Sequence, residues 1–179
     1  MKATGIVRRI DDLGRIVIPK EIRRTMHIRE GAQLEIFTEN DGTVIFRKYS
    51  PIGELSDYAD HYAETLAKVT GNGVIIADRE QIISFGGVRK ELSGKRISPD
   101  TEKLMETRRT YAYRIGEPRI RLSAEEEKLY VGVCSPIVQD GDPIGAVISL
   151  IPDLGNAPGE AEVKVVSAAA LLLKRQMEP

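Results

Sequence analysis

Short runs of β-branched residues and closely spaced turn residues dominate the first fifty positions of this chain. The spacing leaves no room for a long helix, so it restricts this part to short strands and tight turns. Strands are expected at residues 4–10, 15–18, 34–38 and 43–46. Residues 11–14 and 40–42 supply the turns between them, and a short helix is expected at residues 20–26 after a proline. The predicted order is β-β-α-β-β.

A module of this size has a packing problem. About fifty residues arranged as two hairpins bury little apolar surface, and domains this small are marginal alone. Size alone favours, without requiring, a second copy that shares one core with the first. We expect residues 1–50 to form an obligate dimer with interleaved hairpins.

The charge of the chain is unevenly distributed. Residues 1–29 contain eight Lys or Arg and three Asp or Glu, a net charge of +5. From residue 50 onward there are 16 bases and 20 acids, a net charge of −4. The overall charge of −1 and the pI near 6.2 conceal this contrast. A basic N-terminal module suits a polyanion such as DNA, although clustered arginines are also common on solvated surfaces.

Two helices with regular apolar spacing are expected in the remainder of the chain. Ser50 and Pro51 suit a helix start, and the turn residues 70–73 end that helix. Apolar residues recur three and four positions apart in this helix and again near the C-terminus: Ile52, Leu55, Ala59, Tyr62, Leu66 and Val69, then Val163, Val166, Ala170, Leu173 and Met177. Such seams fit either contacts between subunits or packing on the chain's own sheet. If they join subunits, a charged residue at position 66 or 173 would split a tetramer into dimers.

Residues 71–179 predict an α+β domain of the sensor type. Strands are expected at residues 74–77 and 81–85, and a helix at 98–108. The clearest hairpin joins residues 129–138 to residues 144–151 across an Asp-Gly turn. Residues 110–127 have no pattern that assigns them to an element.

Catalytic and metal-binding patterns are absent from the sequence. The single cysteine, Cys134, lies in an apolar run and is expected to be buried and inert. The only histidines are His27 and His61, and Asp140 to Asp142 fit a hairpin turn better than a cation loop. We therefore expect no enzymatic activity and no cofactor. No apolar run approaches the roughly 20 residues of a membrane span, so we expect a cytoplasmic protein.

Residues 5–24, which read GIVRRIDDLGRIVIPKEIRR, resemble the DNA-binding domain of the AbrB-type transition-state regulators. The similarity continues through Leu34-Glu35-Ile36 to Lys48-Tyr49. Two later segments, SPIV at residues 135–138 and GDPIGAV at residues 141–147, resemble the GAF-like C-terminal domain of sporulation regulators in this family. The expected fold class is therefore mixed β and α+β, with an AbrB-type module followed by a GAF-like domain.

The resemblance implies a dimeric swapped-hairpin barrel that binds double-stranded DNA without a recognition helix. The DNA-contacting residues of the family fall on four arginines, with Arg9 as a basic neighbour: Arg8, Arg15, Arg23 and Arg24. Other basic residues of the module lack this support and are interpreted as peripheral or structural: Lys2, Lys20, Arg29, Arg47 and Lys48. The resemblance further implies a homotetramer formed through helices, a place on the nucleoid and control of forespore genes.

Three functions remain open at this point. The first is a transcription regulator with a DNA-binding module at residues 1–50, a connecting helix at 51–70 and a regulatory domain at 71–179. The second is an antitoxin-like interaction protein, against which the length and patterning of the C-terminal part argue. The third is a GAF-type sensor of an unidentified small molecule with incidental DNA affinity.

Overall fold

The structure is a computed structural model that describes residues 5–28, 30–88, 91–126, 128–151 and 156–177. The chain divides into two compact units, Met1–Tyr49 and Ser50–Pro179.

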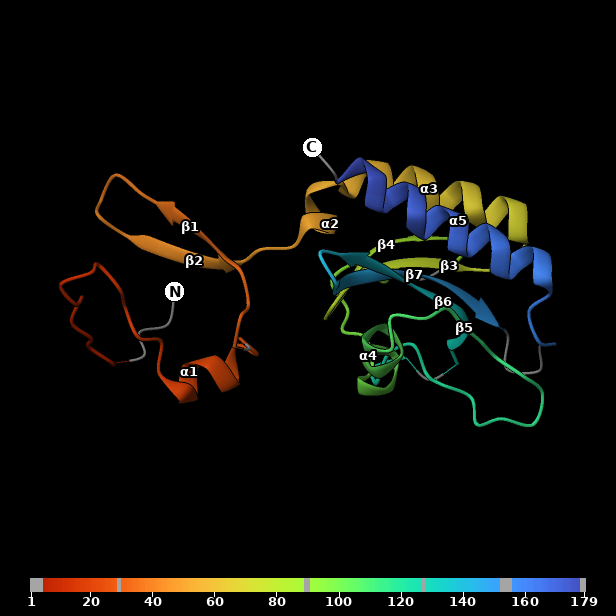
Figure 1. Cartoon of the computed structure of the whole chain (residues 1–179), viewed down its shortest axis with the longest axis horizontal. Helices are drawn as coiled ribbons and strands as arrows, with labels where there is room; N and C mark the ends of the chain where they lie inside the picture. The colour runs from red at the N-terminus through yellow and green to blue at the C-terminus, as the bar shows by residue number, and fades with distance from the viewer. Residues whose placement is uncertain (1–4, 29, 89–90, 127, 152–155, 178–179) are drawn as a thin grey trace. The chain divides into compact units, whose positions relative to one another are not determined.

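The N-terminal unit contains one short helix and one hairpin (Figure 1). Helix α1 spans Lys20–Thr25, strand β1 spans Leu34–Thr38 and strand β2 spans Val44–Lys48. The two strands pair antiparallel, with Ile36 opposite Phe46. Gly42 adopts a φ of 86° in the connecting turn, a conformation that glycine reaches without steric cost. The short helix and the second hairpin expected from the sequence are confirmed.

The first hairpin expected from the sequence forms only its turn. The turn forms, since the N–H of Gly14 donates to the Asp11 carbonyl at 3.0 Å and Gly14 has a φ of 74°. The flanking residues 5–10 and 15–18, however, are not strands, and Thr4 lies outside the described residues. A strand exists only when a neighbour accepts and donates its backbone hydrogen bonds. The expectation of two strands here is wrong for a single chain, and no closed barrel is present in the described part of it.

Apolar side chains of the N-terminal unit remain in water. Among its described residues only Pro19 is buried. Val7 is 90% exposed and Val17 is 73% exposed. A domain that leaves its valines and isoleucines in solvent has not gained the burial on which folding depends.

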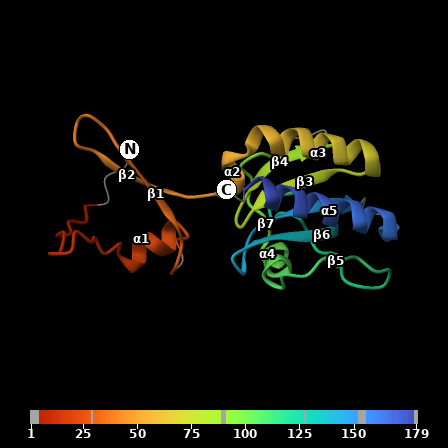
Figure 2. The ribbon, with the colours of Figure 1, turned by 45° about the horizontal axis from the view of Figure 1, so that its top comes forward.

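The C-terminal unit is built around an antiparallel sheet of five strands in the order β4-β3-β7-β6-β5. The strands are β3 (Val74–Asp78), β4 (Ile82–Gly86), β5 (Tyr111–Ala112), β6 (Tyr130–Gln139) and β7 (Asp142–Ile151). The helices are α2 (Pro51–Glu54), α3 (Ser56–Thr70), α4 (Pro99–Glu106) and α5 (Glu160–Gln176). Helices α3 and α5 lie side by side over one face of the sheet, and α4 lies on the other side (Figures 1 and 2).

Local sequence signals account for these boundaries. The hydroxyl of Ser50 accepts a hydrogen bond from the N–H of Gly53 at 3.2 Å, which caps α2. The expected helix over residues 51–70 is interrupted at Leu55, so that it forms α2 and α3. Gly71 ends α3 in the left-handed conformation, with a φ of 72°. The predicted hairpin around residues 140–141 is confirmed as β6 and β7.

Both faces of the sheet carry a filled core. The face under α3 and α5 buries side chains of the two expected seams, including Ile52, Ala59, Leu66, Val166, Ala170 and Leu173. The opposite face buries Ile75, Ile82, Leu92, Met105, Leu122, Val131, Cys134 and Ile148 among others. The seams are therefore core packing at these positions, which was the simpler of the two interpretations. Leu66 and Leu173 point into the domain core, so a charge at either position is expected to destabilise the domain itself and not to act on an assembly alone.

Close backbone approach sets the position of α3 on the sheet. A Cβ atom at Gly86 would lie 2.3 Å from the carbonyl oxygen of Ala63 and 2.7 Å from the backbone nitrogen of Glu64. Both distances are far shorter than van der Waals contact, so only glycine fits this position of β4. The helix backbone consequently rests directly on the edge strand.

No helix in the described ranges is long and apolar enough to cross a membrane.

Candidate nucleic-acid interface

The five arginines selected from the sequence lie on three segments of the N-terminal unit. Arg8 and Arg9 are exposed in the extended stretch before the 11–14 turn. Arg15 follows that turn directly. Arg23 and Arg24 occupy the last turn of α1, where Arg23 is half-buried and Arg24 is exposed. The structure thus leaves all five able to reach solvent, and it gives a defined geometry to Arg15 in particular.

Asp11 organises the turn that presents Arg15. One carboxylate oxygen accepts the backbone N–H groups of Leu13 at 3.0 Å and of Arg15 at 2.7 Å. The other accepts the Nε–H of Arg15 at 2.7 Å. The backbone hydrogen bond from Arg15, followed by the one from its guanidinium, holds the pKa of Asp11 below its ordinary value. Asp11 is a functional candidate that we did not select from the sequence, where it stood only as part of a turn.

This arrangement leaves most of the Arg15 guanidinium available. Its Nε–H is fixed by Asp11, whereas the terminal nitrogens project from a side chain that is 69% exposed. A guanidinium held at one edge presents its remaining donors in a preset plane, which suits the oxygen atoms of a phosphate or the acceptor edge of guanine. The turn therefore orders one arginine before any ligand arrives.

Arg47 has a structural contact of a different kind. Its guanidinium lies 4.5 Å from the centroid of the Phe37 ring, across the β1–β2 hairpin. A cation held over an aromatic face stabilises the hairpin itself. This agrees with the interpretation of Arg47 as peripheral or structural.

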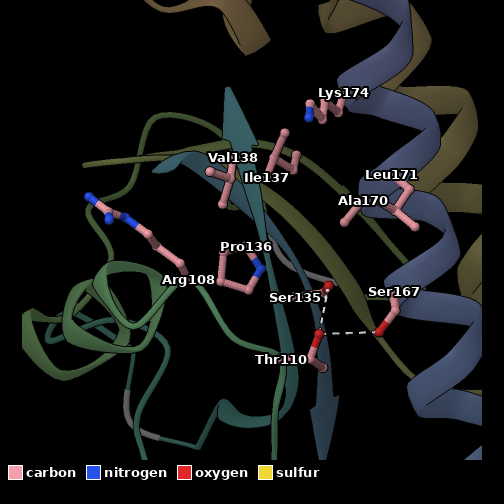
Figure 3. Close-up of a pocket in the computed structure, with 10 residues that line it drawn as sticks. All are labelled: Arg108, Thr110, Ser135, Pro136, Ile137, Val138, Ser167, Ala170, Leu171 and Lys174. Carbon is pink, nitrogen blue, oxygen red and sulfur yellow. Dashed lines mark hydrogen bonds between the residues drawn. The ribbon is translucent and has the colours of Figure 1, made fainter. Parts of the chain in front are cut away.

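The C-terminal unit contains a shallow cavity of about 270 Å³ between β6 and α5 (Figure 3). Three hydroxyl groups at its base form a chain, in which Thr110 lies 3.1 Å from Ser135 and 3.3 Å from Ser167. The Arg108 guanidinium points away from these hydroxyls in Figure 3 and lies 3.7 Å from the Asp142 carboxylate. The polar groups of the cavity thus contact one another or neighbouring residues and do not converge on a common point.

Neither catalysis nor metal binding is supported by the side chains present. No group of three or more His, Cys, Asp or Glu residues in the described ranges could hold a metal ion. Cys134 is buried, and burial raises the pKa of its thiol to about 12. A thiol with that pKa stays protonated and unreactive near neutral pH.

Comparison with known families accounts for both units. Residues 54–178 match the model described as "Stage V sporulation protein T C-terminal, transcription factor". The chain is also 48% identical to stage V sporulation protein T of Bacillus subtilis over 99% of both chains. The chain belongs to the stage V sporulation protein T family. That family consists of transcription factors, which agrees with the expectation that the chain is not an enzyme.

The N-terminal unit has relatives of its own. Residues 7–54 match the model described as "Antidote-toxin recognition MazE, bacterial antitoxin". The transition state regulatory protein AbrB of Bacillus subtilis is 44% identical over 92 residues, which is 47% of this chain and 88% of that protein. The similarity to AbrB-type regulators seen in the sequence is thereby confirmed.

The C-terminal unit has the fold of GAF domains. The GAF domain of PixJ from Thermosynechococcus elongatus covers 72% of this chain and 90% of its own, with 14% identity and a TM-score of 0.52. The type II free methionine-R-sulfoxide reductase from Thermoplasma acidophilum gives a TM-score of 0.53 at 13% identity, over 70% of this chain and 94% of that chain. At such low identity the similarity establishes the fold alone.

Proposed function

We propose that this protein is a sporulation-associated transcription regulator, cytoplasmic and bound to the nucleoid, whose N-terminal module binds duplex DNA through Arg8, Arg9, Arg15, Arg23 and Arg24. The observation that carries the proposal is a small module with a net charge of +5 over its first 29 residues and one arginine already oriented by a turn. Phosphate neutralisation by such residues releases counterions and supplies affinity without sequence preference. Membership of a transcription factor family agrees with it.

The DNA-binding unit in this proposal is a dimer of residues 1–50. The support is the exposed apolar surface of the single module, since Val7, Val17 and Ile36 all lie in solvent. A second copy would cover these side chains and provide hydrogen-bonding partners for residues 5–10 and 15–18. Interleaved hairpins would also close the sheet into a barrel and remove its free edges.

The GAF-like domain, linked to that module through residues 51–70, serves assembly in this proposal. The outward faces of α3 and α5 retain apolar side chains, among them Tyr58, Val69 and Leu172. Pairing two such helix pairs would bury this surface as a four-helix contact and join two dimers into a tetramer. The contact residues are these outward positions, because the inward positions of both helices are already core.

No small-molecule ligand is assigned to the domain. The sheet face opposite α3 and α5 is occupied by the side chains of the second core cluster. The cavity beside α5 is shallow and its polar groups do not converge. A specific ligand pocket combines enclosure with a few converging polar groups. An assembly role for the domain requires neither an enclosed pocket nor converging polar groups.

An antitoxin-like role is the second candidate, because residues 7–54 match an antitoxin model. The match ends where the GAF-like domain begins, and that domain matches a transcription factor model over its length. A regulator accounts for the whole chain, whereas the antitoxin function accounts for the first unit alone.

A salt series measures the proposed interface directly. If Arg8, Arg15, Arg23 and Arg24 each meet one phosphate in both subunits, roughly eight contacts give a log–log slope of affinity against salt of about −7. Changing one of them to alanine removes two contacts and should flatten the slope by about 2. The measurement is fluorescence anisotropy of the full chain on duplex DNA, with circular dichroism to establish that each variant is folded.

The control is Arg47→Ala, which should leave the slope unchanged because Arg47 stacks on Phe37. Reduced affinity on every sequence indicates phosphate contact, and reduced affinity mainly on preferred sites indicates contact with a base edge. Unchanged affinity and slope in folded variants of all four arginines would refute the proposed interface.

A further inference from the structure

A second basic segment lies in the otherwise acidic C-terminal unit. Residues 107–122 contain five arginines and one glutamate, a net charge of +4, whereas residues 50–179 as a whole carry −4. Five of the nine arginines in this unit fall between Arg108 and Arg121. Most of this segment falls within residues 110–127, which the sequence pattern did not assign to an element, and the DNA-binding role of the N-terminal unit does not use it.

The fold gathers the segment at one edge of the sheet. Tyr111 pairs with Cys134, and the N–H of Tyr113 donates to the Gly132 carbonyl at 2.8 Å. Farther along, the N–H of Val131 donates to the Ile120 carbonyl at 2.8 Å. Both ends of the segment therefore line the same outer edge of β6, and residues 114–119 project from it as a loop (Figure 1).

Several arginines of the segment face solvent without a counter-charge. Arg109, Arg114 and Arg121 are exposed. Across the described ranges, the guanidinium of none of these three has an ion pair or hydrogen bond. Exposed arginines usually find a nearby carboxylate in an acidic domain, so three unneutralised ones in thirteen residues form a region of positive potential.

The backbone that carries these arginines is fixed. The carbonyl of Arg121 accepts hydrogen bonds from the Ser98 hydroxyl at 2.6 Å and from the Thr101 hydroxyl at 2.9 Å. At the base of the loop, the Arg119 guanidinium lies 5.6 Å from the ring centroids of both Tyr113 and Tyr130. These contacts hold the backbone at both ends of the loop in place, which lowers the conformational entropy that the segment would lose on binding a partner.

The loop tip is also ordered. The N–H of Glu117 donates to the Arg114 carbonyl at 3.1 Å, and Gly116 has a φ of 95°. This is a β-turn that holds Ile115 in solvent at 78% exposure beside Arg114. An apolar side chain flanked by arginines suits the sugar face of a nucleic-acid backbone, where deoxyribose carbons lie between phosphates.

We propose that this edge, defined by Arg109, Arg114 and Arg121, is a second contact surface for duplex DNA in the C-terminal domain. It rests on the proposed DNA-binding function, because the N-terminal module brings DNA to the same molecule and so raises its effective concentration at the edge. The contacts are to phosphates and carry no sequence information. Guanidinium groups match phosphate oxygens in geometry, and their weak hydration makes them easier to desolvate than lysines.

The test uses the full-length chain and a triple variant, Arg109→Gln with Arg114→Gln and Arg121→Gln. Removing one phosphate-binding arginine should flatten the salt slope by about 0.9, so the expected change is roughly 1 to 3 per chain on a long duplex. Affinity at moderate salt should fall at least about threefold. The matched control removes three exposed bases elsewhere in the domain and outside α3 and α5, Arg79→Gln with Arg96→Gln and Lys103→Gln, and should leave the slope within error.

A charge-preserving variant separates contact from folding. Replacing the same three arginines with lysine should retain most of the parent slope, because lysine also neutralises phosphate. Circular dichroism and a thermal melt establish that all variants fold. A folded glutamine variant with the parent's slope and affinity overturns the proposal. The proposal is also overturned if the glutamine variant keeps its binding to duplex DNA and loses only solubility. The same holds if it loses only binding to RNA or to an acidic protein.

The same assay distinguishes this inference from the proposed function. An Arg15→Ala variant that loses DNA binding, beside a glutamine triple variant that does not, overturns the second surface alone. If the parent protein does not bind duplex DNA, or if none of the N-terminal arginine variants weakens binding, the proposed function fails with it.

Discussion

The two units of this chain solve the problem of burying apolar surface in opposite ways. The C-terminal unit covers both faces of a five-stranded sheet with its own helices and loops, and residues such as Ile76, Ile148 and Leu173 are almost completely buried. The N-terminal unit has comparable side chains, but Val7, Ile10 and Val17 lie in water. One unit buries its apolar side chains within a single chain, and the other leaves many of them exposed.

The comparison shows that apolar residues of the same types are packed internally in one unit and remain exposed in the other. In the C-terminal unit most apolar residues are consumed by internal packing, and those left exposed include the outward positions of α3 and α5 and Ile115. In the N-terminal unit nearly every apolar residue is still available. We therefore expect a second copy to stabilise the N-terminal unit far more than the C-terminal unit.

The largest expected effect separates core positions from contact positions on α5. Leu173→Glu places an unpaired charge in the core and should cost about 4 kcal/mol or more, enough to unfold the C-terminal unit. Leu172→Glu changes a neighbouring residue that is 48% exposed, so the domain should stay folded while tetramers separate into dimers. Native mass spectrometry measures the assembly, and thiol labelling of Cys134 measures unfolding because that thiol is buried in the folded domain.

In this experiment the parent should be tetrameric and its thiol protected. Rapid labelling is expected in Leu173→Glu alone. A folded, protected Leu173→Glu protein would contradict the assignment of this residue to the core. A Leu172→Glu protein with the same mass as the parent assembly would contradict the proposed helix contact.

A smaller effect on stability should show whether a second copy covers the exposed apolar residues of the N-terminal unit. Neighbouring residues of a strand point to opposite faces, so pairing with a second chain should bury either Ile16 or Val17. At least one of Ile16→Asp and Val17→Asp should then destabilise the module by about 2 to 4 kcal/mol. Ile115→Asp, at an isoleucine of the C-terminal unit that is 78% exposed, should change stability by less than about 0.5 kcal/mol.

Denaturant unfolding of the full chain at two protein concentrations provides the measurement. The first transition should move with concentration in the parent, since a dimer dissociates as it unfolds. A first transition that does not move with protein concentration, or Ile16→Asp and Val17→Asp proteins that are both as stable as the parent, would contradict the expected dimer.

The smallest expected effect concerns the turn at Asp11. Because hydrogen bonds from Arg15 lower the pKa of this carboxyl in the folded protein, the turn gains stability above the ordinary value of 3.8. That stability is lost as the pH falls through the lower, folded-state pKa. Carboxyl-selective nuclear magnetic resonance should show Asp11 titrating below 3.8, and Asp11→Asn should abolish the transition. Titration at or above 3.8 would disprove the ion pair with Arg15.

The sequence predicted elements well where their hydrogen-bonding partners are close in the chain. The β1–β2 and β6–β7 hairpins follow from alternation and turn residues, and the Ser50 and Gly71 caps follow from local backbone chemistry. The strands expected at 4–10 and 15–18 failed because a strand needs a neighbour that one chain does not supply. Residues 110–127 gave no pattern because their structure comes from pairing with the distant β6 edge.

The candidate site could also be predicted only in part from the sequence. The identities of the arginines came from a family resemblance, since exposed basic residues have no periodicity that marks one as functional. The role of Asp11 depended on three hydrogen bonds that the sequence does not display. The helical seams illustrate a further limit, because spacing by three and four residues reports a buried stripe without saying whether the chain itself or a second copy covers it.

Gly86 has a mechanical consequence for the domain that follows the DNA-binding module. At Gly86 no side chain separates β4 from the backbone of α3, so the two main chains touch directly at this position. A large change in the angle or register of α3 would bring these main-chain atoms into steric overlap. A displacement of α3 should therefore carry the sheet with it, and a methyl group at position 86 should push the helix away from β4 and destabilise the domain.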